Sequence, residues 1–461
     1  MAHVLLSALL LVLSPAFALS APRALDLPFL GVNLGAGVIA QTPWALPAFR
    51  KALAPLHLNS MRFPSGTAGN YYNWTCGCST ESDKHSDPTY LTDLARAVGD
   101  AGAPATFMLN MLTMDLDSQL AMLRAAAALQ LNISVVELGN EWYLQKADYV
   151  ARFPTAADYV REALQWRAAI LAAWPTARVA LVLAPSVVNG AAREAGWNAG
   201  VFAALAAQGV SSGIDAVMHE YHPSGVQCAG GCTLDASRVG VFLASPASIA
   251  ATVAAAVEAL PPVVRSVWIT EFGLKPIDAT SECSVYGTWG DGLWSALLAL
   301  LLFDSPRVAI VDKQDLAGYV NSGQLFLAAD AFDVSGSPDS KLTVAPFAQS
   351  AAGSALALVA NASAGANGME PLDLSAASPA LVARSFFGAA AGTRALIVNP
   401  SAAAATVPAT MLPHAVGSAL SATADATAPI DGKKYAVAYT ASSVGRAGEV
   451  HIPAYSVTLV Y

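Results

Sequence analysis

The sequence contains few charged side chains and almost no clustered basic ones. Charged residues make up 12% of its 461 positions, with 24 Lys and Arg against 33 Asp and Glu and a formal net charge of −9. The only adjacent basic pairs are Arg50-Lys51 and Lys433-Lys434. Proteins that follow a phosphate backbone need clustered cations, so this composition argues against a nucleic-acid partner.

Long apolar runs are also missing beyond the N-terminus, although the mean hydropathy is +0.47. Charge, Pro or Gly soon interrupts the later apolar runs, which therefore predict buried strands and helices and no membrane span in the mature protein. The segment from Val4 to Val12 differs, because it is almost entirely apolar and is followed by small residues. It predicts a signal peptide over residues 1–20, cut after Ala18 or Ser20, and a protein that is secreted, extracellular or held in the endomembrane lumen.

Cysteine is scarce as well, and the odd count of five leaves at least one thiol without an intrachain partner. The five are Cys76, Cys78, Cys228, Cys232 and Cys283. Cys228 and Cys232 could close a small loop and Cys283 could reach Cys76 or Cys78, so the pairing stays open. The spacings differ from those of zinc-binding knuckles, and no metal site is expected.

Short apolar runs alternate with longer helical patterns, which predicts a parallel sheet covered by helices. Strands are expected at 29–33, 59–63, 105–110, 135–139, 179–184, 215–219, 266–270 and 307–311. Helices are expected near 44–56, 88–101, 117–130, 155–173, 192–207, 246–259, 289–303 and 343–358. Eight such pairs are typical of a (β/α)8 barrel, which we expect to span residues 21–358.

From about residue 360 the sequence changes to Ala, Ser, Thr and Val without a helical period. Short runs such as Ala395 to Val398 and Ser456 to Tyr461 predict strands there. The predicted fold class is therefore α/β, a TIM barrel followed by an all-β sandwich over residues 359–461. The segment from Ala24 to Leu27 is expected to add a strand to that sandwich.

Two glutamates directly follow predicted barrel strands, where a charge is costly without a reason. Glu141 comes after the fourth strand and Glu271 after the seventh. Active sites of these barrels lie at the carboxyl ends of the strands, and strands four and seven lie on opposite sides of the mouth. Two carboxyl groups facing each other there can flank one glycosidic bond, one as proton donor and the other as nucleophile. The pair therefore predicts glycosidase chemistry rather than two exposed loop residues.

Asn140-Glu141 together with Glu271 resembles the clan A retaining glycosidases, in which the first Glu is the acid/base and the second is the nucleophile. Within that clan, the residues most resemble glycoside hydrolase family 79, the heparanase and β-glucuronidase family. The resemblance rests on Glu137 to Glu141, Met61-Arg62-Phe63, Lys313-Gln314 and the final run Ile452 to Leu459.

The sequence departs from that family at three places. Trp142, Pro64-Ser65-Gly66 and Lys313 stand where the family often has Pro, Gly-Gly and Arg. Because Lys lacks the planar fork with which Arg grips a carboxylate, the departures put the identity of the sugar in doubt.

The resemblance also implies roles for the residues around the glutamates. Asn140 would bind the sugar 2-hydroxyl, and Tyr221 would hold the nucleophile or serve as a plain aromatic platform. Arg62 would keep the nucleophile ionised or form a structural salt bridge with Glu137. His219, which could equally be an ordinary barrel histidine, and Lys313 and Gln314 complete the expected substrate-binding or supporting set.

The expected function is that of a secreted retaining β-glycosidase of the β-glucuronidase type, with a carbohydrate partner and no cofactor or metal. Two alternatives stay open. One is another clan A activity, such as a xylosidase, a glucosylceramidase-like enzyme or an arabinofuranosidase. The other is a non-catalytic carbohydrate-binding protein on the same scaffold. For the enzyme, the pKa of Glu141 should be raised and that of Glu271 depressed.

Three sequons predict where N-glycans could be attached in a eukaryotic host. We expect glycans at Asn132 and Asn361. The sequon at Asn73 lies in the loop after the second strand, near the expected mouth of the barrel, so it is expected to stay unused.

Overall fold

The structure is a computed structural model of the whole chain. It describes residues 22–461 except 28, 35–46, 81–87, 187–189, 224, 228–233, 276–281, 286, 315, 319–326, 329–348, 389–391, 414–416, 429, 431–435 and 444–447. The predicted signal peptide and the residues Cys228 and Cys232 lie outside these described residues, so those predictions stay open.

Eight parallel strands close into a barrel in the order β11-β13-β2-β3-β6-β7-β8-β9. Their bounds are β2 Leu30–Asn33, β3 Ser60–Phe63, β6 Ala105–Met108, β7 Val135–Glu137, β8 Arg178–Val182, β9 Ile214–Pro223, β11 Val264–Lys275 and β13 Val308–Gln314. Each coincides with one of the eight predicted apolar runs. Such apolar runs predict strands because both faces of a parallel barrel strand are buried, one inside the barrel and one under the helices. The predicted TIM barrel is confirmed.

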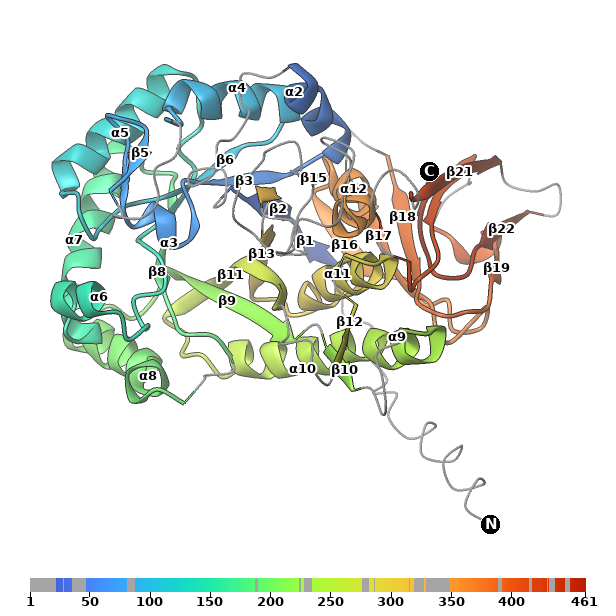
Figure 1. The fold of residues 1–461 in the computed structure, drawn as a ribbon. Coiled ribbons are helices and arrows are strands. Elements are labelled where there is room, and N and C mark those ends of the chain that lie inside the picture. The colour runs from blue at the N-terminus through green and yellow to red at the C-terminus, as the bar shows by residue number, and fades with distance from the viewer. Residues whose placement is uncertain are drawn as a thin grey trace, which may run out of the picture.

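A ring of helices surrounds the barrel (Figure 1). The helices are α2 Pro47–Leu53, α4 Leu91–Ala101, α5 Leu116–Ala128, α6 Ala147–Arg152, α7 Ala156–Ala173, α8 Ala192–Ala207, α9 Ala236–Leu243, α10 Ser245–Glu258, α11 Trp289–Leu302 and α12 Ala351–Ser363. A short helix, α3 Gly66–Gly69, lies in the loop after β3. Helix α12 begins at Ala351 because Ser350 caps it, the Ser350 hydroxyl accepting a hydrogen bond from the Gly353 amide at 2.9 Å. It ends later than the predicted helix over 343–358, whose first residues lie outside the described part of the chain.

The C-terminal residues form an antiparallel β domain beside α11 and α12 (Figure 1). Its main sheet has the order β1-β16-β17-β18-β23-β20-β21, and β19 Ala405–Pro408 pairs separately with β22 Glu449–Ile452. The main-sheet strands are β1 Arg23–Ala24, β16 Gly368–Pro371, β17 Val382–Phe387, β18 Arg394–Asn399, β20 Ser418–Thr423, β21 Ala438–Ser443 and β23 Ser456–Val460. Apolar side chains from both sheets, among them Ile397, Val407 and Ile452, form a core between them. The predicted C-terminal β-sandwich is confirmed.

The N-terminal strand belongs to this second domain. Arg23 and Ala24 of β1 pair with Met369 and Gly368 of β16. The described part of the chain therefore passes along the edge of the β domain before it enters the barrel. Helices α11 and α12 are buried along almost their whole length, because the β domain covers the side that does not face the barrel.

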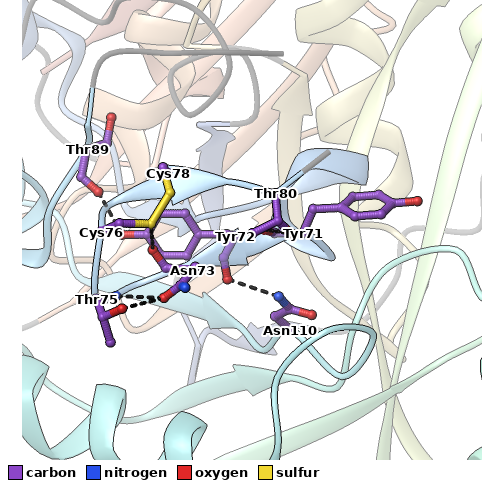
Figure 2. The surroundings of a disulfide bond; sticks show 9 residues. All are labelled: Tyr71, Tyr72, Asn73, Thr75, Cys76, Cys78, Thr80, Thr89 and Asn110. Carbon is purple, nitrogen blue, oxygen red and sulfur yellow. Dashed lines mark hydrogen bonds between the residues drawn. A yellow bond between two sulfur atoms is a disulfide. The ribbon is translucent and has the colours of Figure 1, made fainter. Parts of the chain in front are cut away.

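One disulfide bond is present among the described residues, and it joins two cysteines whose pairing the sequence left open. Cys76 is bonded to Cys78 within the hairpin of β4 Tyr72–Asn73 and β5 Cys78–Ser79, as Figure 2 shows. Of the pairings left open by the sequence, this bond excludes one between Cys283 and Cys76 or Cys78. Gly77 between them has a φ of +66°, and a Cβ there would lie 2.9 Å from the Thr89 backbone, so the turn favours glycine.

Among the described residues, one helical stretch, Ala236–Glu258, is long and apolar enough to cross a membrane on length and composition alone. It consists of α9 and α10, both packed against α11. Core helices pass the same test, so this is weak evidence for a membrane span.

The two predicted glycan sites lie in different surroundings. Asn132 is exposed between α5 and β7. Asn361 lies in α12, and its side-chain amide donates to the Tyr461 hydroxyl at 3.3 Å. Occupancy of both sites stays a prediction.

Candidate active site

Glu141 is presented by a sharp turn at the carboxyl end of β7. Gly139 has a φ of +90°, and a Cβ there would lie 2.3 Å from the Trp142 ring. Glu141 itself has a φ of 52°, an uncommon backbone conformation for a residue other than glycine. The Trp142 indole closes the turn by donating to the Leu138 carbonyl at 3.0 Å. The turn leaves the Glu141 side chain 18% exposed at the mouth of the barrel.

Glu271 lies opposite, within β11, and its side chain is only 4% exposed. Two groups donate to its carboxylate. Arg62 Nη1 lies 2.6 Å from Oε1, and the Tyr221 hydroxyl donates to Oε2. One charged and one neutral donor therefore fix the orientation of this carboxylate.

Arg62 connects three acidic or polar side chains beneath the mouth. Its Nε donates to Glu137 Oε2 at 2.7 Å, and its Nη2 donates to the Asn140 side-chain oxygen at 2.9 Å. The guanidinium is fully buried. The sequence allowed two roles for Arg62, as a partner of Glu271 or in a salt bridge with Glu137. The structure contains both contacts.

His219 lies between the two glutamates. Its Nδ1 is 3.6 Å from Glu141 Oε1 and 3.7 Å from Glu271 Oε2. The sum of these distances, about 7.3 Å, is an upper bound on the separation of the two oxygens. The imidazole is 3% exposed, so it forms part of the floor of the site.

The charges around Glu141 and His219 shift their pKa values in opposite directions. Burial is the largest influence on Glu141 and raises its pKa, but the adjacent His219, the Tyr143 hydroxyl and Lys146 outweigh burial and lower the pKa overall. Burial lowers the pKa of His219, but the charge of Glu271 and the contact with Glu141 outweigh it and raise the pKa overall. The expected raised pKa of Glu141 is therefore wrong for this geometry, because the histidine takes up the proton first.

Two residues that the sequence analysis did not single out hold Asn140 and Glu141 in place. The Asn70 side chain donates to the Asn140 carbonyl at 2.8 Å and accepts from the Asn140 amide at 3.1 Å. The Tyr143 hydroxyl donates to Glu141 Oε1 at 2.9 Å. Asn70 lies in the Gly- and Tyr-rich loop after β3, and that composition was the one available signal for it. Tyr143 had none beyond its closeness to Glu141.

The structure separates Lys313 from the site, which corrects its predicted role in substrate binding. Lys313 is fully buried on the outer face of β13, where its Nζ lies 3.2 Å from the Ser295 hydroxyl of α11. Side chains alternate along a strand, so its neighbour Gln314 faces the other way. The Gln314 side-chain oxygen accepts from the amide of Asn33 on β2.

Within the described residues, no three His, Cys, Asp or Glu side chains converge in a way that could hold a metal ion. The mouth brings together two carboxyl groups, an imidazole, a phenol and a guanidinium. A carboxylate fixed by donors opposite a carboxyl group that exchanges a proton is the arrangement needed for double displacement at an acetal carbon.

The barrel, the β domain and the glutamate pair define a class of proteins, the (β/α)8 barrels with two carboxyl groups across the mouth. No family model matches the sequence, and no curated protein matches it. Solved structures do match in fold. One is an α-L-arabinofuranosidase from Thermotoga maritima, with 12% identity, coverage of 96% of this chain and 98% of that chain, and a TM-score of 0.64.

Two further matches have similar coverage. A family 51 α-L-arabinofuranosidase from Bifidobacterium longum has 17% identity, coverage of 96% of each chain and a TM-score of 0.62. A 4-O-α-L-rhamnosyl-β-D-glucuronidase from Fusarium oxysporum has 16% identity, coverage of 95% of this chain and 97% of that chain, and a TM-score of 0.58. The chain thus shares the fold of these enzymes over nearly its whole length.

Proposed function

We propose that the protein is a retaining glycoside hydrolase that acts on O-glycosides by double displacement. The observation that carries the proposal is the placement of Glu141 and Glu271 within 3.7 Å of one nitrogen of His219, at the carboxyl ends of β7 and β11. The fold of solved glycosidases supports it.

In the proposed reaction, Glu271 attacks the anomeric carbon while Glu141 gives a proton to the leaving oxygen. Arg62 and Tyr221 hold the Glu271 carboxylate through hydrogen bonds to both of its oxygens. The glycosyl ester that forms is then attacked by water, from which Glu141 takes a proton. Asn140 lies between Arg62 and Glu141, which suits the expected bond to the sugar 2-hydroxyl.

His219 has a defined part in this cycle as the holder of the exchangeable proton. Substrate in the mouth would cover the exposed part of Glu141 and raise its pKa by removing water. The proton would then move from His219 to Glu141 across their 3.6 Å contact. Formation of the ester removes the charge of Glu271, which is the strongest influence raising the pKa of His219. The first change places the proton on Glu141, which then acts as the donor in the first step. The second change lowers the pKa of His219, so Glu141 rather than His219 accepts the proton in the second step.

For the sugar, an α-L-arabinofuranoside is the first candidate, because family 51 arabinofuranosidases recur among the structures with the same fold. A β-glucuronide is the second candidate, supported by the residues that resemble family 79 and by the similarity to the Fusarium enzyme. Lys313 no longer supports a uronide, because its ammonium group lies against α11 and away from the mouth.

A panel of nitrophenyl glycosides tests the proposal, with arabinofuranoside, glucuronide, xyloside and glucoside as arms. We expect turnover of one sugar by the unmodified protein, lost in Glu141→Gln and in Glu271→Gln. Glu258→Gln is the matched control, because Glu258 binds Ser305 outside the barrel. Sugar binding without turnover of any arm would support the carbohydrate-binding protein instead.

We also propose that the protein is exported. The apolar segment from Val4 to Val12 supports this, and so does the Cys76–Cys78 bond, because disulfides persist mainly in oxidising compartments. Sequencing the N-terminus of the protein recovered from its native host tests the proposal, and a start at or close to Ala21 is the expected result.

A further inference from the structure

One layer of the barrel core is unusually polar. The strand registers place Arg62 of β3, Glu137 of β7, Val217 of β9 and Asp312 of β13 at one level inside the barrel. Four residues from alternate strands normally form such a layer, and they are usually Val, Ile or Leu. Here three of the four are ionisable, and each of these three is fully buried.

Asp312 has no role in the chemistry described above, yet its position is specific. Its carboxyl group lies over Gly31 of β2, where a Cβ would come within 2.2 Å of Oδ1. Glycine at this point of β2 therefore makes room for the carboxyl group. A fully buried charged group directly after the apolar run from Val308 to Val311 would be costly without a partner.

Three oxygens in this layer lack a hydrogen bond of ordinary geometry among the described residues. They are both carboxyl oxygens of Asp312 and Oε1 of Glu137, and all three are buried. The other oxygen of Glu137 accepts from Arg62. Buried polar atoms almost always have a hydrogen-bond partner, and a proton on Asp312 would turn one of these oxygens into a donor for another.

The charges that face Asp312 favour its uncharged form. Burial is the largest influence, and the charge of Glu137 on β7 is the next. Together they raise the pKa of Asp312 well above its usual range, although Arg62 on β3 and the backbone amide of Gly31 act in the opposite direction. Gly31 on β2 and Val217 on β9 bring no charge. Lys313 lies on the other face of β13.

We propose that Asp312 is a positioning residue that stays protonated in the working protein and donates its hydroxyl to Oε1 of Glu137, directly or through one enclosed water. This bond fixes the Glu137 carboxylate from the side opposite Arg62. Glu137 in turn holds the Arg62 fork, which reaches Glu271 at 2.6 Å and Asn140 at 2.9 Å. Only the role of Glu271 as the nucleophile rests on the proposed function.

The proton on Asp312 is tested directly by infrared difference spectroscopy of the unmodified protein against Asp312→Asn at neutral pH. The expected result is a carbonyl stretching band of a protonated carboxylic acid that is present in the first protein and lost in the second. A loss of carboxylate bands instead would overturn the proposal. The measurement needs no substrate, so it remains decisive even if no glycoside is turned over.

The positioning role is tested by comparing two variants with a turned-over glycoside. Asp312→Asn keeps a donor for Glu137, and most of the activity should remain. Asp312→Leu removes the donor, and kcat should fall about 10- to 100-fold with little change in KM, because a displaced Arg62 misplaces Glu271. Asp291→Asn is the matched control, since Asp291 is equally buried but lies on α11 outside the barrel. Equal losses of kcat in Asp312→Asn and Asp312→Leu would refute the positioning role.

Discussion

Arg62 Nη1 lies 2.6 Å from Oε1 of Glu271, while Nε of the same guanidinium lies 2.7 Å from Oε2 of Glu137. One fully buried cation thus serves two carboxylates, one in the barrel floor and one at the mouth. Planar Arg can do this because its donors diverge in a fixed fork. The arrangement ties the stability of the barrel interior to the orientation of the proposed nucleophile.

Substitution of Arg62 should therefore lower the activity by more than the accompanying loss of stability explains. In Arg62→Lys the charge remains but three directed bonds cannot form, and we expect kcat to fall about 100-fold, as for a nucleophile displaced by about 1 Å. Arg178→Lys is the matched control, because Arg178 forms a comparable pair with Asp215 at the other end of the barrel. Thermal unfolding and kcat of both variants check this, and equal kcat values for the two would count against the role of Arg62.

Removal of each proposed catalytic carboxyl group should leave a distinct chemical signature. Glu271→Ala should lose turnover, and azide should restore it by giving the glycosyl azide of inverted configuration, because the anion replaces the nucleophile. In Glu141→Ala, azide should instead attack the glycosyl ester on Glu271 and give the retained adduct. Proton NMR of the products distinguishes the two anomers. The same adduct from both variants would mean that the roles are assigned wrongly.

The eight strands and the glutamate pair were predictable because their signals are local. A buried parallel strand reads as a short apolar run, and a carboxylate directly after such a run stands out against it. Glu141 and Glu271 therefore came from the sequence, although the contacts between them did not. His219 reaches both from β9, and its effect on the pKa of Glu141 depends on a distance that no spacing along the chain contains.

Lys313 and Asp312 show where sequence-based reasoning failed. They are adjacent in β13, and a strand places neighbours on opposite faces, so a shift of one residue exchanges the inside and outside of the barrel. The family resemblance drew attention to Lys313, which faces α11, whereas Asp312 is the residue that faces Arg62. The Cys76–Cys78 bond was not predicted either. Two cysteines separated by one residue can bond only if that residue, Gly77, has a suitable backbone conformation.

The turn that presents Glu141 should not tolerate a side chain at position 139. In Gly139→Ala, the φ of +90° becomes strained and the new Cβ meets the Trp142 ring at 2.3 Å. We expect a loss of stability of about 1–3 kcal/mol from the backbone alone, and a larger proportional loss of kcat because Glu141 moves. Gly99→Ala in α4 is the control, since nothing lies within 4 Å of its Cβ and alanine favours a helix. Chemical denaturation and kcat measured on both variants check the prediction.

The contact between His219 and Glu141 predicts how stability depends on pH. The folded-state pKa of His219 is raised above 6.5, so its contribution is fully present below pH 6.5 and is lost as the pH rises through the folded-state value. The folded-state pKa of Glu141 is lowered below 4.5, so its contribution is fully present above pH 4.5 and is lost as the pH falls through the folded-state value. Both contributions are complete only between these two limits.

His219→Gln removes the imidazole and with it the mutual stabilisation of the two groups. The difference in unfolding free energy between the unmodified protein and His219→Gln should therefore be largest between pH 4.5 and pH 6.5 and should shrink on both sides. Denaturant unfolding across this range measures it, and His57→Gln is the control because burial lowers the pKa of His57. For His57 the sign is opposite, since a lowered pKa makes protonation destabilising. A difference for His219→Gln that stays constant with pH would mean that the proton does not reside on His219 and that Glu141 keeps it throughout.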